Sequence, residues 1–369
     1  MTVYLDHAAT SPLRPEVLAA YTDALQLVGN PSAIHSAGQA ARAMLEEARE
    51  RIAAVVGCDR NEVIFTSGGT ESNNLGIKGL FAKRDGNLII TSAAEHHAVL
   101  DAVEHLEKQG AEVHWLSMTD EGVIDLDELS RVLEKRHRET AFVALMWVNN
   151  ETGVITPIAE VAALAAQYGV PVHSDGVAAF GHTETNFAAS GLATMALAAH
   201  KLGGPVGVGA LIVSRATELV PLFHGGGQER SIRAGTMNAA GATAFATAAE
   251  TPQPDFVALE ELAVQLISPL GKLTRGNAPG VPNILSFTFE GASGESMLFL
   301  LDQAEISVSN GSACTAGVAR ASHVLIAMGF SEADASSALR ISFGPQTTAE
   351  DVKALAEALP KVVATARKI

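Results

Sequence analysis

Two side chains in this sequence lie in surroundings that favour chemistry. Lys201 is the only charged residue of the apolar, glycine-rich stretch "AHKLGGPVGVGALIV". Because apolar surroundings lower the pKa of a lysine, its amine could act as the nucleophile that forms a Schiff base. Cys314 lies in "NGSACTAGVA", where small neighbours leave a thiol accessible for reaction. Each has an ordinary alternative: a solvated lysine at a strand end, and a small residue that fills a surface loop.

Three further polar residues each follow an apolar run of strand length. Asp175 ends a buried strand in "PVHSDG", where a carboxylate could keep the nitrogen of a heterocycle protonated, as the pyridine nitrogen of pyridoxal phosphate requires. His96 in "AEHH" could stack on a planar ring, and Asn150 in "VNNETG" could donate to a phenolate oxygen. The structural alternatives are a helix cap for Asp175 or His96 and a turn for Asn150.

Anion binding is predicted at two places. "SGGTES" joins a strand to a helix, and its free backbone N–H groups at Gly69, with the hydroxyl of Thr70, suit a phosphate. His200 could add a donor to the same anion. Arg340 in "ALRISFG" suits a substrate carboxylate, which a guanidinium binds through two hydrogen bonds. The alternatives are a tight strand–helix turn and a structural ion pair.

The elements that must position these residues alternate between strand and helix from residue 36 to about 213. Continuous apolar runs such as "AFVALMWV" (141–148) predict strands buried on both faces. The fold class is therefore α/β, with a mostly parallel sheet covered by helices, and ligands should bind beyond the carboxyl ends of the strands. We expect five polar segments to converge on that rim: "SGGTES", "AEHH", "VNNETG", "HSDG" and "AHKLGG".

The pattern changes near "ETPQPDF" (250–256), where two prolines interrupt a helix rich in small residues. The strands and helices that follow are typical of a smaller α+β unit. We therefore expect a large domain at 12–250 and a small domain at 1–11 and 251–369, with Cys314 in the small domain.

The composition excludes several classes of protein. Of the 369 residues, 47% are hydrophobic and 18% charged, as in compact soluble proteins rather than disordered ones. A net charge of −16 disfavours nucleic acid and anionic membranes as partners. The two cysteines, Cys58 and Cys314, suit a reducing compartment, and "MTVYLDHAAT" lacks the features of a signal peptide. We expect a cytoplasmic protein with no membrane span and no metal site.

Several motifs occur together in the order and spacing of one known family. They are "YLDHAATSP", "GNPSAIHSAG", "EVIFTSGGTESNN", "AEHHAVL", "VNNETG", "HSDG", "AHKLGGPVGVGAL", "GGGQERSIRAGT" and "NGSACTAG". Across nearly its whole length the chain resembles the cysteine desulfurases, class V aminotransferase-like proteins that use pyridoxal 5'-phosphate. This resemblance implies fold type I of the pyridoxal-phosphate-dependent transferases. The "GSAC" loop is similar to that of the subgroup that serves iron–sulfur assembly and tRNA thiolation.

The resemblance implies a role at the cofactor for each candidate residue. Lys201 would form the Schiff base with pyridoxal phosphate, and Asp175 would pair with its ring nitrogen. His96 would stack on the ring and, like Lys201, could move the proton at the substrate's α-carbon. Asn150 would reach the ring oxygen or the substrate.

The same resemblance implies a phosphate site shared between two subunits. Gly69, Thr70 and His200 would hold the phosphate from one subunit. Thr236 in "RAGT" occupies the position from which the second subunit completes the site in this family. An obligate homodimer is therefore expected.

The resemblance also implies the reaction. Asn30, Asn150 and Arg340 would bind the substrate L-cysteine, and Cys314 would accept its sulfur, which leaves L-alanine and a persulfide. A sulfur-acceptor protein, either a cluster scaffold or a tRNA-thiolation enzyme, would then take the sulfur. We expect no direct contact with nucleic acid.

Two positions depart from the pattern of the family. Ala178 replaces a glutamine that many relatives carry three residues after the aspartate, and Ala198 replaces a serine three residues before the lysine. The loss of two neutral hydrogen bonds would weaken cofactor binding by about 1–3 kcal/mol in total. The alternatives to a desulfurase are a selenocysteine lyase or an aminotransferase of the same fold, or a cofactor-poor scaffold relative.

Overall fold

The computed structural model describes residues 2–311 and 321–368, so the predicted sulfur acceptor, Cys314, lies outside the described residues. Seven strands form the largest sheet. They are β2 (Val63–Thr66), β3 (Leu88–Ser92), β4 (Glu112–Leu116), β5 (Thr140–Ala144), β6 (Val172–Asp175), β7 (Thr194–Ala198) and β8 (Gly209–Val213). Their order in the sheet is β2-β8-β7-β6-β5-β3-β4. All neighbours from β7 to β4 are parallel, and only β8 is antiparallel to its two neighbours, so the prediction of a mostly parallel sheet is confirmed.

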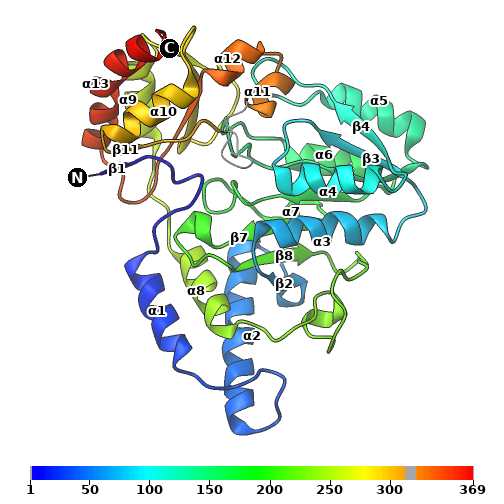
Figure 1. The fold of residues 1–369 in the computed structure, drawn as a ribbon. Coiled ribbons are helices and arrows are strands. Elements are labelled where there is room, and N and C mark those ends of the chain that lie inside the picture. The colour runs from blue at the N-terminus through cyan, green and yellow to red at the C-terminus, as the bar shows by residue number, and fades with distance from the viewer. Residues whose placement is uncertain (1, 312–320, 369) are drawn as a thin grey trace.

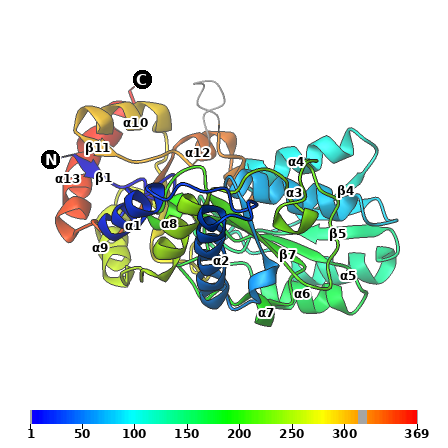
Figure 2. The same ribbon diagram turned by 90° about the horizontal axis from the view of Figure 1, so that it is seen from below.

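Helices cover both faces of this sheet because alternate residues of each strand are apolar on opposite sides. The helices are α3 (Gly69–Phe81), α4 (His97–Glu107), α5 (Leu126–Arg136), α6 (Ile158–Ala166) and α7 (Phe187–Ser190). In β3, Ile89 belongs to a core cluster with α3 and α4, whereas Leu88 and Ile90 belong to a cluster with α5, α6 and α7. Figure 2 shows α3 and α4 on one side of the strands and α5, α6 and α7 on the other.

The apolar run 141–148 is only partly a strand. β5 ends at Ala144, although the next four residues are also buried. Leu145 still donates its N–H to the carbonyl of His173 at 3.1 Å, and Trp147 donates to the carbonyl of Asp175 at 3.0 Å. The prediction of one strand of eight residues was therefore wrong, since β5 ends at Ala144, although the backbone beyond it still donates hydrogen bonds to β6.

The last third of the chain builds a second core. Its elements are α9 (Val257–Ile267), β9 (Lys272–Leu273), β10 (Ile284–Thr288), α10 (Gly294–Gln303), β11 (Ile306–Ser307), α11 (His323–Ala327), α12 (Glu332–Ser336), β12 (Ala338–Ser342) and α13 (Ala349–Ala366). β10 pairs antiparallel with β12 and β9, and the N-terminal β1 (Val3–Tyr4) pairs parallel with β11. Figure 1 shows α13, α9 and α10 together at the upper left, beside the N-terminus. The domain limits 1–11, 12–250 and 251–369 stay a prediction.

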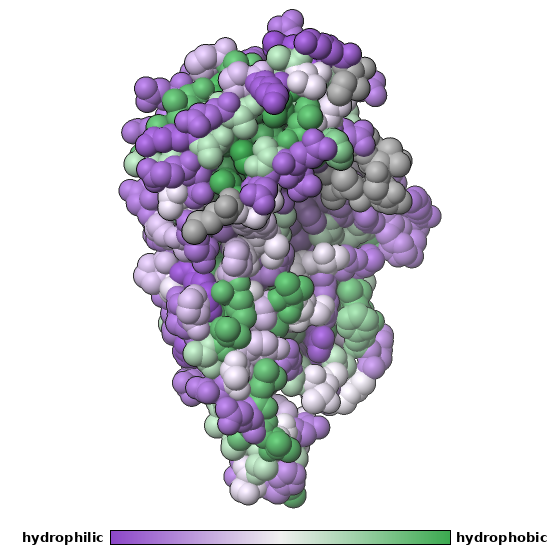
Figure 3. Space-filling view, turned by 60° about the vertical axis from the view of Figure 1, so that its left-hand side comes forward, coloured by the Kyte–Doolittle hydropathy of each residue, from purple (hydrophilic) through white to green (hydrophobic). Residues whose placement is uncertain are grey.

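Three helices lie side by side below the sheet in Figure 1: α1 (Pro15–Leu25), α2 (Ser36–Val56) and α8 (Ala239–Glu250), with α8 packed against the other two. Large apolar side chains on α1 and on the segment before α2 are exposed, namely Leu18, Leu25, Leu27, Val28 and Ile34. Figure 3 shows hydrophobic residues spread over the lower part of this face. Among the helices that the structure describes, none combines the length and the apolar character that crossing a membrane requires.

Candidate active site

A cavity of about 270 Å³ lies at the carboxyl ends of the parallel strands. Each of the five polar segments expected to meet on this rim contributes to its wall, so that prediction is confirmed. The polar lining residues are Gly69, Thr70, Asn73, His96, Asn150, Asp175, His200 and Lys201.

Asp175 is the last residue of β6, and its carboxylate is held by two donors. Asn73 Nδ2 donates to Oδ2 at 2.7 Å, and the N–H of Val177 donates to Oδ1 at 2.9 Å. Nε2 of His173 lies 2.9 Å from Asn73 Oδ1, and burial lowers the pKa of His173 to about 3, so this imidazole is neutral. The carboxylate is thereby fixed in one orientation, with lone pairs left for a further donor from the cavity.

Lys201 follows β7 in a single 3₁₀ turn, His200–Leu202. Its amine donates to the carbonyl oxygens of Ala8 and Ala9, at 3.0 Å for Ala9. Burial and then the charge of Arg340 lower the pKa of Lys201 to about 8, although nearby carboxylates act in the opposite direction. With this pKa about one amine in ten is neutral at pH 7, against about one in 3000 for an ordinary lysine. The amine is therefore available as a nucleophile near neutral pH.

The rate at which the apoprotein combines with pyridoxal phosphate should rise with pH and reach half its maximum near pH 8, the pKa of Lys201. Only the neutral amine attacks an aldehyde, so the rate follows deprotonation of Lys201. Stopped-flow absorbance measures this rate, with Lys201→Ala as the blank and butylamine as a reference for titration of the aldehyde itself. A midpoint near the ordinary lysine pKa of 10.5 contradicts the lowered pKa.

His96 lines the cavity and also caps a helix. Its Nδ1 accepts the N–H of Ala98 at 3.0 Å, at the N-cap of α4. Because Nδ1 is an acceptor, the neutral imidazole carries its proton on Nε2. Burial is the main cause that lowers the pKa of His96. The charge of Asp175 raises this pKa, and the charge of Lys201 lowers it further. The helix cap thus fixes the tautomer, and stacking on a cofactor ring stays a prediction.

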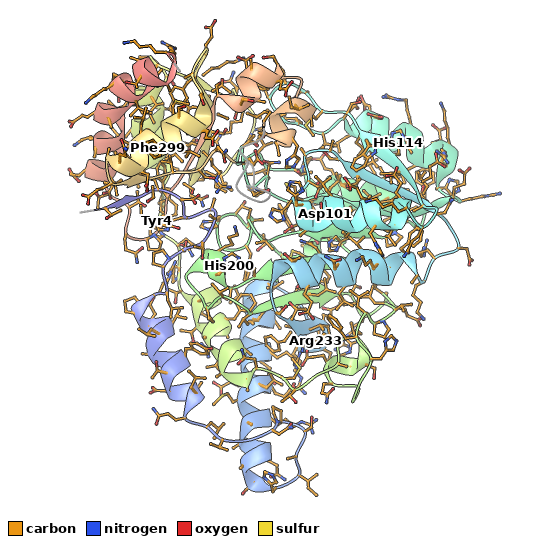
Figure 4. The ribbon with its side chains drawn as sticks, viewed as in Figure 1. Tyr4, Asp101, His114, His200, Arg233 and Phe299 are labelled. Atoms are coloured by element: carbon orange, nitrogen blue, oxygen red, sulfur yellow. The ribbon has the colours of Figure 1, made fainter. Side chains whose placement is uncertain are left out.

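The turn between β2 and α3 has the features of an anion site. Gly68 has a φ of 148°, a conformation that an L side chain rarely adopts. Gly69 and Thr70 are the first residues of α3, and the first N–H groups of a helix have no partner within it. His200 lies on the same wall, and burial, with the charge of Lys201, lowers its pKa to about 4. Its neutral imidazole, at the centre of Figure 4, offers one N–H to an anion.

A salt bridge offsets a negative charge beside this turn. Glu71 lies in the first turn of α3, where its Oε2 accepts the N–H of Ser67 at 2.7 Å. Nε of Arg233 donates to Glu71 Oε1 at 2.9 Å, and Figure 4 shows Arg233 below α3. An unpaired carboxylate here would repel a bound anion, so the guanidinium makes the turn more favourable for phosphate.

Asn150 lines the cavity, and Arg340, which is not among the described lining residues, contacts its backbone. The Oδ1 atom of Asn150 is buried and has no hydrogen-bond partner among the described residues. Nη1 of Arg340 donates to the Asn150 carbonyl at 3.0 Å, and Nη2 donates to Asp6 Oδ1 at 2.7 Å. Arg340 thus makes the ion pair that was its structural alternative, and its binding of a substrate carboxylate stays a prediction.

Three predicted residues are not among those brought together here. Asn30 and Thr236 are exposed, and neither belongs to the described lining of the cavity. The role expected of Thr236 is in the site of a second subunit. Cys314 lies outside the described residues. The roles of all three stay predictions.

Asn73 and Ala9 line the cavity but were missed in the sequence. Asn73 lies four residues after Gly69, a spacing that places both on one face of a helix, so the pattern after "SGG" could have indicated it. Ala9 contributes a carbonyl, for which no side-chain pattern gives a signal. The N-terminal segment reaches the site because Ser11 donates its N–H to the His200 carbonyl at 3.0 Å.

The residues present fit pyridoxal phosphate. This group requires an amine that attacks an aldehyde, an anionic partner for the ring nitrogen and donors for a phosphate. Lys201, Asp175 and the turn at Gly69 supply these three groups on one cavity wall, and the unpaired Oδ1 of Asn150 adds a polar atom. Ala178 and Ala198 also line the cavity, so part of the wall is apolar.

The chain is similar to known proteins over nearly its whole length. The aminotransferase class-V family model matches residues 3–355. The IscS-like cysteine desulfurase of Mycobacterium tuberculosis is 46% identical over 99% of this chain and 97% of its own. A solved NifS-like protein from Rickettsia africae has a TM-score of 0.88 at 30% identity, over 98% of this chain and 99% of that one. SspA, solved in complex with cysteine, has a TM-score of 0.84 at 32% identity, over 94% of this chain and 100% of that one.

The chain therefore belongs to the aminotransferase class-V family. Within that family its relatives are IscS- and NifS-like cysteine desulfurases, and the match extends over essentially the full length of both partners. The resemblance inferred from the motifs is confirmed, as is the fold class.

Proposed function

We propose that this chain is a pyridoxal-phosphate-dependent cysteine desulfurase, which converts free L-cysteine to L-alanine and leaves the sulfur on Cys314. The observation that carries the proposal is the cavity where the Lys201 amine and the Asp175 carboxylate meet, at the ends of the neighbouring strands β7 and β6. The names of the relatives support it, because the cysteine desulfurases among them match the whole chain.

The catalytic residues would act around the cofactor. When bound, pyridoxal phosphate supplies a ring that draws electron density from the substrate's α-carbon. Asp175 would stabilise the protonated ring nitrogen by its negative charge. Lys201 would hold the cofactor covalently, and Lys201 or His96 would move the proton at the α-carbon.

Binding would fall to residues around these. Gly69, Thr70 and His200 would hold the phosphate, with Thr236 of the second subunit. Asn30, Asn150 and Arg340 would bind the substrate. Arg340 would then exchange part of its contact with Asp6 for the carboxylate of L-cysteine, a pairing that a guanidinium makes equally well.

The sulfur step balances in atoms and electrons. The thiolate of Cys314 attacks the sulfur of L-cysteine, so an S–S bond forms as the C–S bond breaks. The electron pair of the C–S bond remains on carbon, which takes a proton to give L-alanine. The enzyme is left with a persulfide, and a sulfur-acceptor protein for iron–sulfur assembly or tRNA thiolation would attack it.

A cytoplasmic homodimer completes the proposal. The large exposed apolar side chains of α1 and of the segment before α2 support the dimer, with Val28 84% and Ile34 91% exposed. Exposed apolar groups of this size are typical of protein interfaces. A second copy of the chain would cover them and bring its Thr236 to the phosphate site.

Purified protein with bound pyridoxal phosphate is expected to release alanine and sulfide in equal amounts from L-cysteine when a thiol reductant is present. The reductant frees the persulfide sulfur as sulfide, so the two products should match. Amino-acid analysis and a colorimetric sulfide assay measure them.

Three other results would contradict the proposal, and each would support one of the alternative functions. An aminotransferase consumes a keto acid and forms no sulfide. A selenocysteine lyase forms alanine from selenocysteine but not from cysteine. A scaffold relative stays colourless when pyridoxal phosphate is added.

A further inference from the structure

Glu151 is a buried carboxylate that none of the proposed steps uses. It follows Asn150 in the turn at the edge of the cavity and is 3% exposed. Its N–H donates to Asn149 Oδ1 at 2.9 Å, which fixes the turn. A buried carboxylate is unfavourable unless it is hydrogen-bonded, so its partners indicate what it holds in place.

The first partner is Ser322, which is itself buried. Its hydroxyl donates to Glu151 Oε2 at 2.5 Å. The same hydroxyl oxygen accepts the N–H of Leu325 at 3.1 Å and so caps α11. One hydroxyl therefore joins the beginning of α11 to the turn that carries Asn150.

His323 makes a second link from the beginning of α11. Its Nε2 donates to the carbonyl of Glu95 at 2.9 Å, and its imidazole lies 4.8 Å from that of His97. Glu95 and His97 flank His96 in the sequence. In Figure 1, α11 and α12 lie between the C-terminal helices and the sheet, as these contacts require.

Gly311 approaches the same carboxylate from the other direction. Its φ is 84°, and a Cβ atom at this position would lie 2.7 Å from Glu151 Oε2, closer than side chains tolerate. Gly311 donates its N–H to Ser309 Oγ at 3.2 Å, and Ser309 exchanges backbone hydrogen bonds of 2.6 and 3.1 Å with Arg340. The chain thus passes Glu151 at Gly311 and again at Ser322.

We propose that Glu151 is a positioning residue for sulfur transfer, because its carboxylate is hydrogen-bonded to Ser322 and packs closely against Gly311, and Cys314 lies between these two residues in the sequence. The inference rests on the proposed function, which gives Cys314 the sulfur step. Glu151 and Asn150 are neighbours in one turn. The turn that lines the cavity is therefore hydrogen-bonded to Ser322, after Cys314 in the sequence, and closely approached by Gly311, before it.

The electrostatics agree with this geometry. Burial raises the pKa of Glu151, and the hydrogen bond from Ser322 is the first of the contributions that lower it, before the charges of His323 and Arg340. The Ser322 hydroxyl is thus the main stabiliser of the carboxylate's charged form. Removing either side chain leaves the other as a buried polar group without this hydrogen bond, which is costly.

The test separates substrate binding from sulfur transfer. L-cysteine should still induce its absorbance change in Glu151→Ala and Ser322→Ala, each with bound cofactor. The concentration of L-cysteine that gives half of this change should equal that of the wild type. Their single-turnover rate of alanine formation should fall roughly tenfold to a hundredfold, the factor for losing a hydrogen bond to a carboxylate. Glu151→Gln, which keeps an oxygen acceptor for Ser322, should recover most of the rate.

Ser331→Ala is the matched control. Ser331 also caps a five-residue helix, α12, and its hydroxyl also donates to a carboxylate, that of Asp334 at 2.7 Å, but it is exposed and does not bond to Glu151. Its transfer rate should stay within about twofold of the wild type, as for an ordinary surface substitution.

A measurement that needs no cofactor tests whether Glu151 fixes the chain at Gly311 and Ser322. Hydrogen–deuterium exchange of the apoprotein should be faster in residues 305–311 and in α11 for Glu151→Ala and Ser322→Ala, and unchanged for Ser331→Ala. The proposal is overturned if Glu151→Ala and Ser322→Ala exchange hydrogen in these residues at the wild-type rate, or if they transfer sulfur at the wild-type rate. It is also overturned if the two variants lose substrate binding and sulfur transfer to the same extent. A wild-type protein that forms no alanine from cysteine refutes the proposed function instead, and the exchange result still decides whether Glu151 holds the two ends.

Discussion

Replacing Lys201 with alanine is expected to lower alanine formation from L-cysteine by about 10²- to 10⁴-fold, the range for losing a group that transfers a proton in the reaction. The variant should also lack the visible absorbance that borohydride abolishes in the wild type. Both losses follow because one amine has two proposed tasks, to hold the cofactor and to move the proton at the α-carbon.

The structure gives physical reasons for so large an effect. The amine of Lys201 reaches the cavity from the end of β7 and donates to the carbonyls of Ala8 and Ala9. Its pKa of about 8 makes it a far better nucleophile at neutral pH than an exposed lysine. Among the described lining residues it is the only lysine, so no second amine takes its place.

The control is Lys83→Ala, which removes a lysine from an exposed pair with Glu218. Exposed ion pairs contribute little to stability, so activity and absorbance should match the wild type. Thermal melts of both variants check the fold. A Lys201→Ala variant that retains borohydride-sensitive absorbance contradicts the assignment of the covalent site.

Replacing Cys314 with alanine is expected to abolish sulfide release from L-cysteine and to leave the cofactor spectrum unchanged. The residues proposed to bind cofactor and substrate lie in other segments, so the absorbance change on adding L-cysteine should persist. Sulfur, however, would have no thiolate to attack it, and the C–S bond would stay intact. Sulfide assays beside absorbance titrations measure the two steps on one sample.

Cys58→Ala is the matched control for this prediction. Burial, with the charges of Glu62 and Asp59, raises the pKa of Cys58 to about 12, so it remains a thiol at neutral pH. Its replacement should leave sulfide release at the wild-type rate. Undiminished sulfide release by Cys314→Ala in the presence of a reductant would remove Cys314 from the mechanism.

The sequence predicted the parts of the site that follow from strand order. Asp175 ends β6 and Lys201 follows the end of β7, and parallel strands bring their carboxyl ends to one edge. The alternation of strand and helix was therefore enough to place them together. The same reasoning predicted the mostly parallel sheet.

What the sequence did not indicate depends on pairs far apart along the chain. Asn73 is 102 residues from Asp175, and Glu151 is 171 residues from Ser322. Asn and Ser are common in turns and helix caps, so neither residue type indicates a distant partner. Arg340 is similar, since only the fold shows that Asp6 already pairs with it.

The pairing of β1 with β11 sets an order for biosynthesis. Val3 pairs with Ile306, so the first strand leaves the ribosome about 300 residues before its partner, a delay of roughly 15 to 60 seconds at ordinary elongation rates. Ala8 is then bound by the hydroxyl of Ser342, which is made later still. The carbonyls that receive the Lys201 amine are thus fixed last, although the lysine itself is made midway. Translation must be nearly complete before a nascent chain can present a finished cavity to its cofactor.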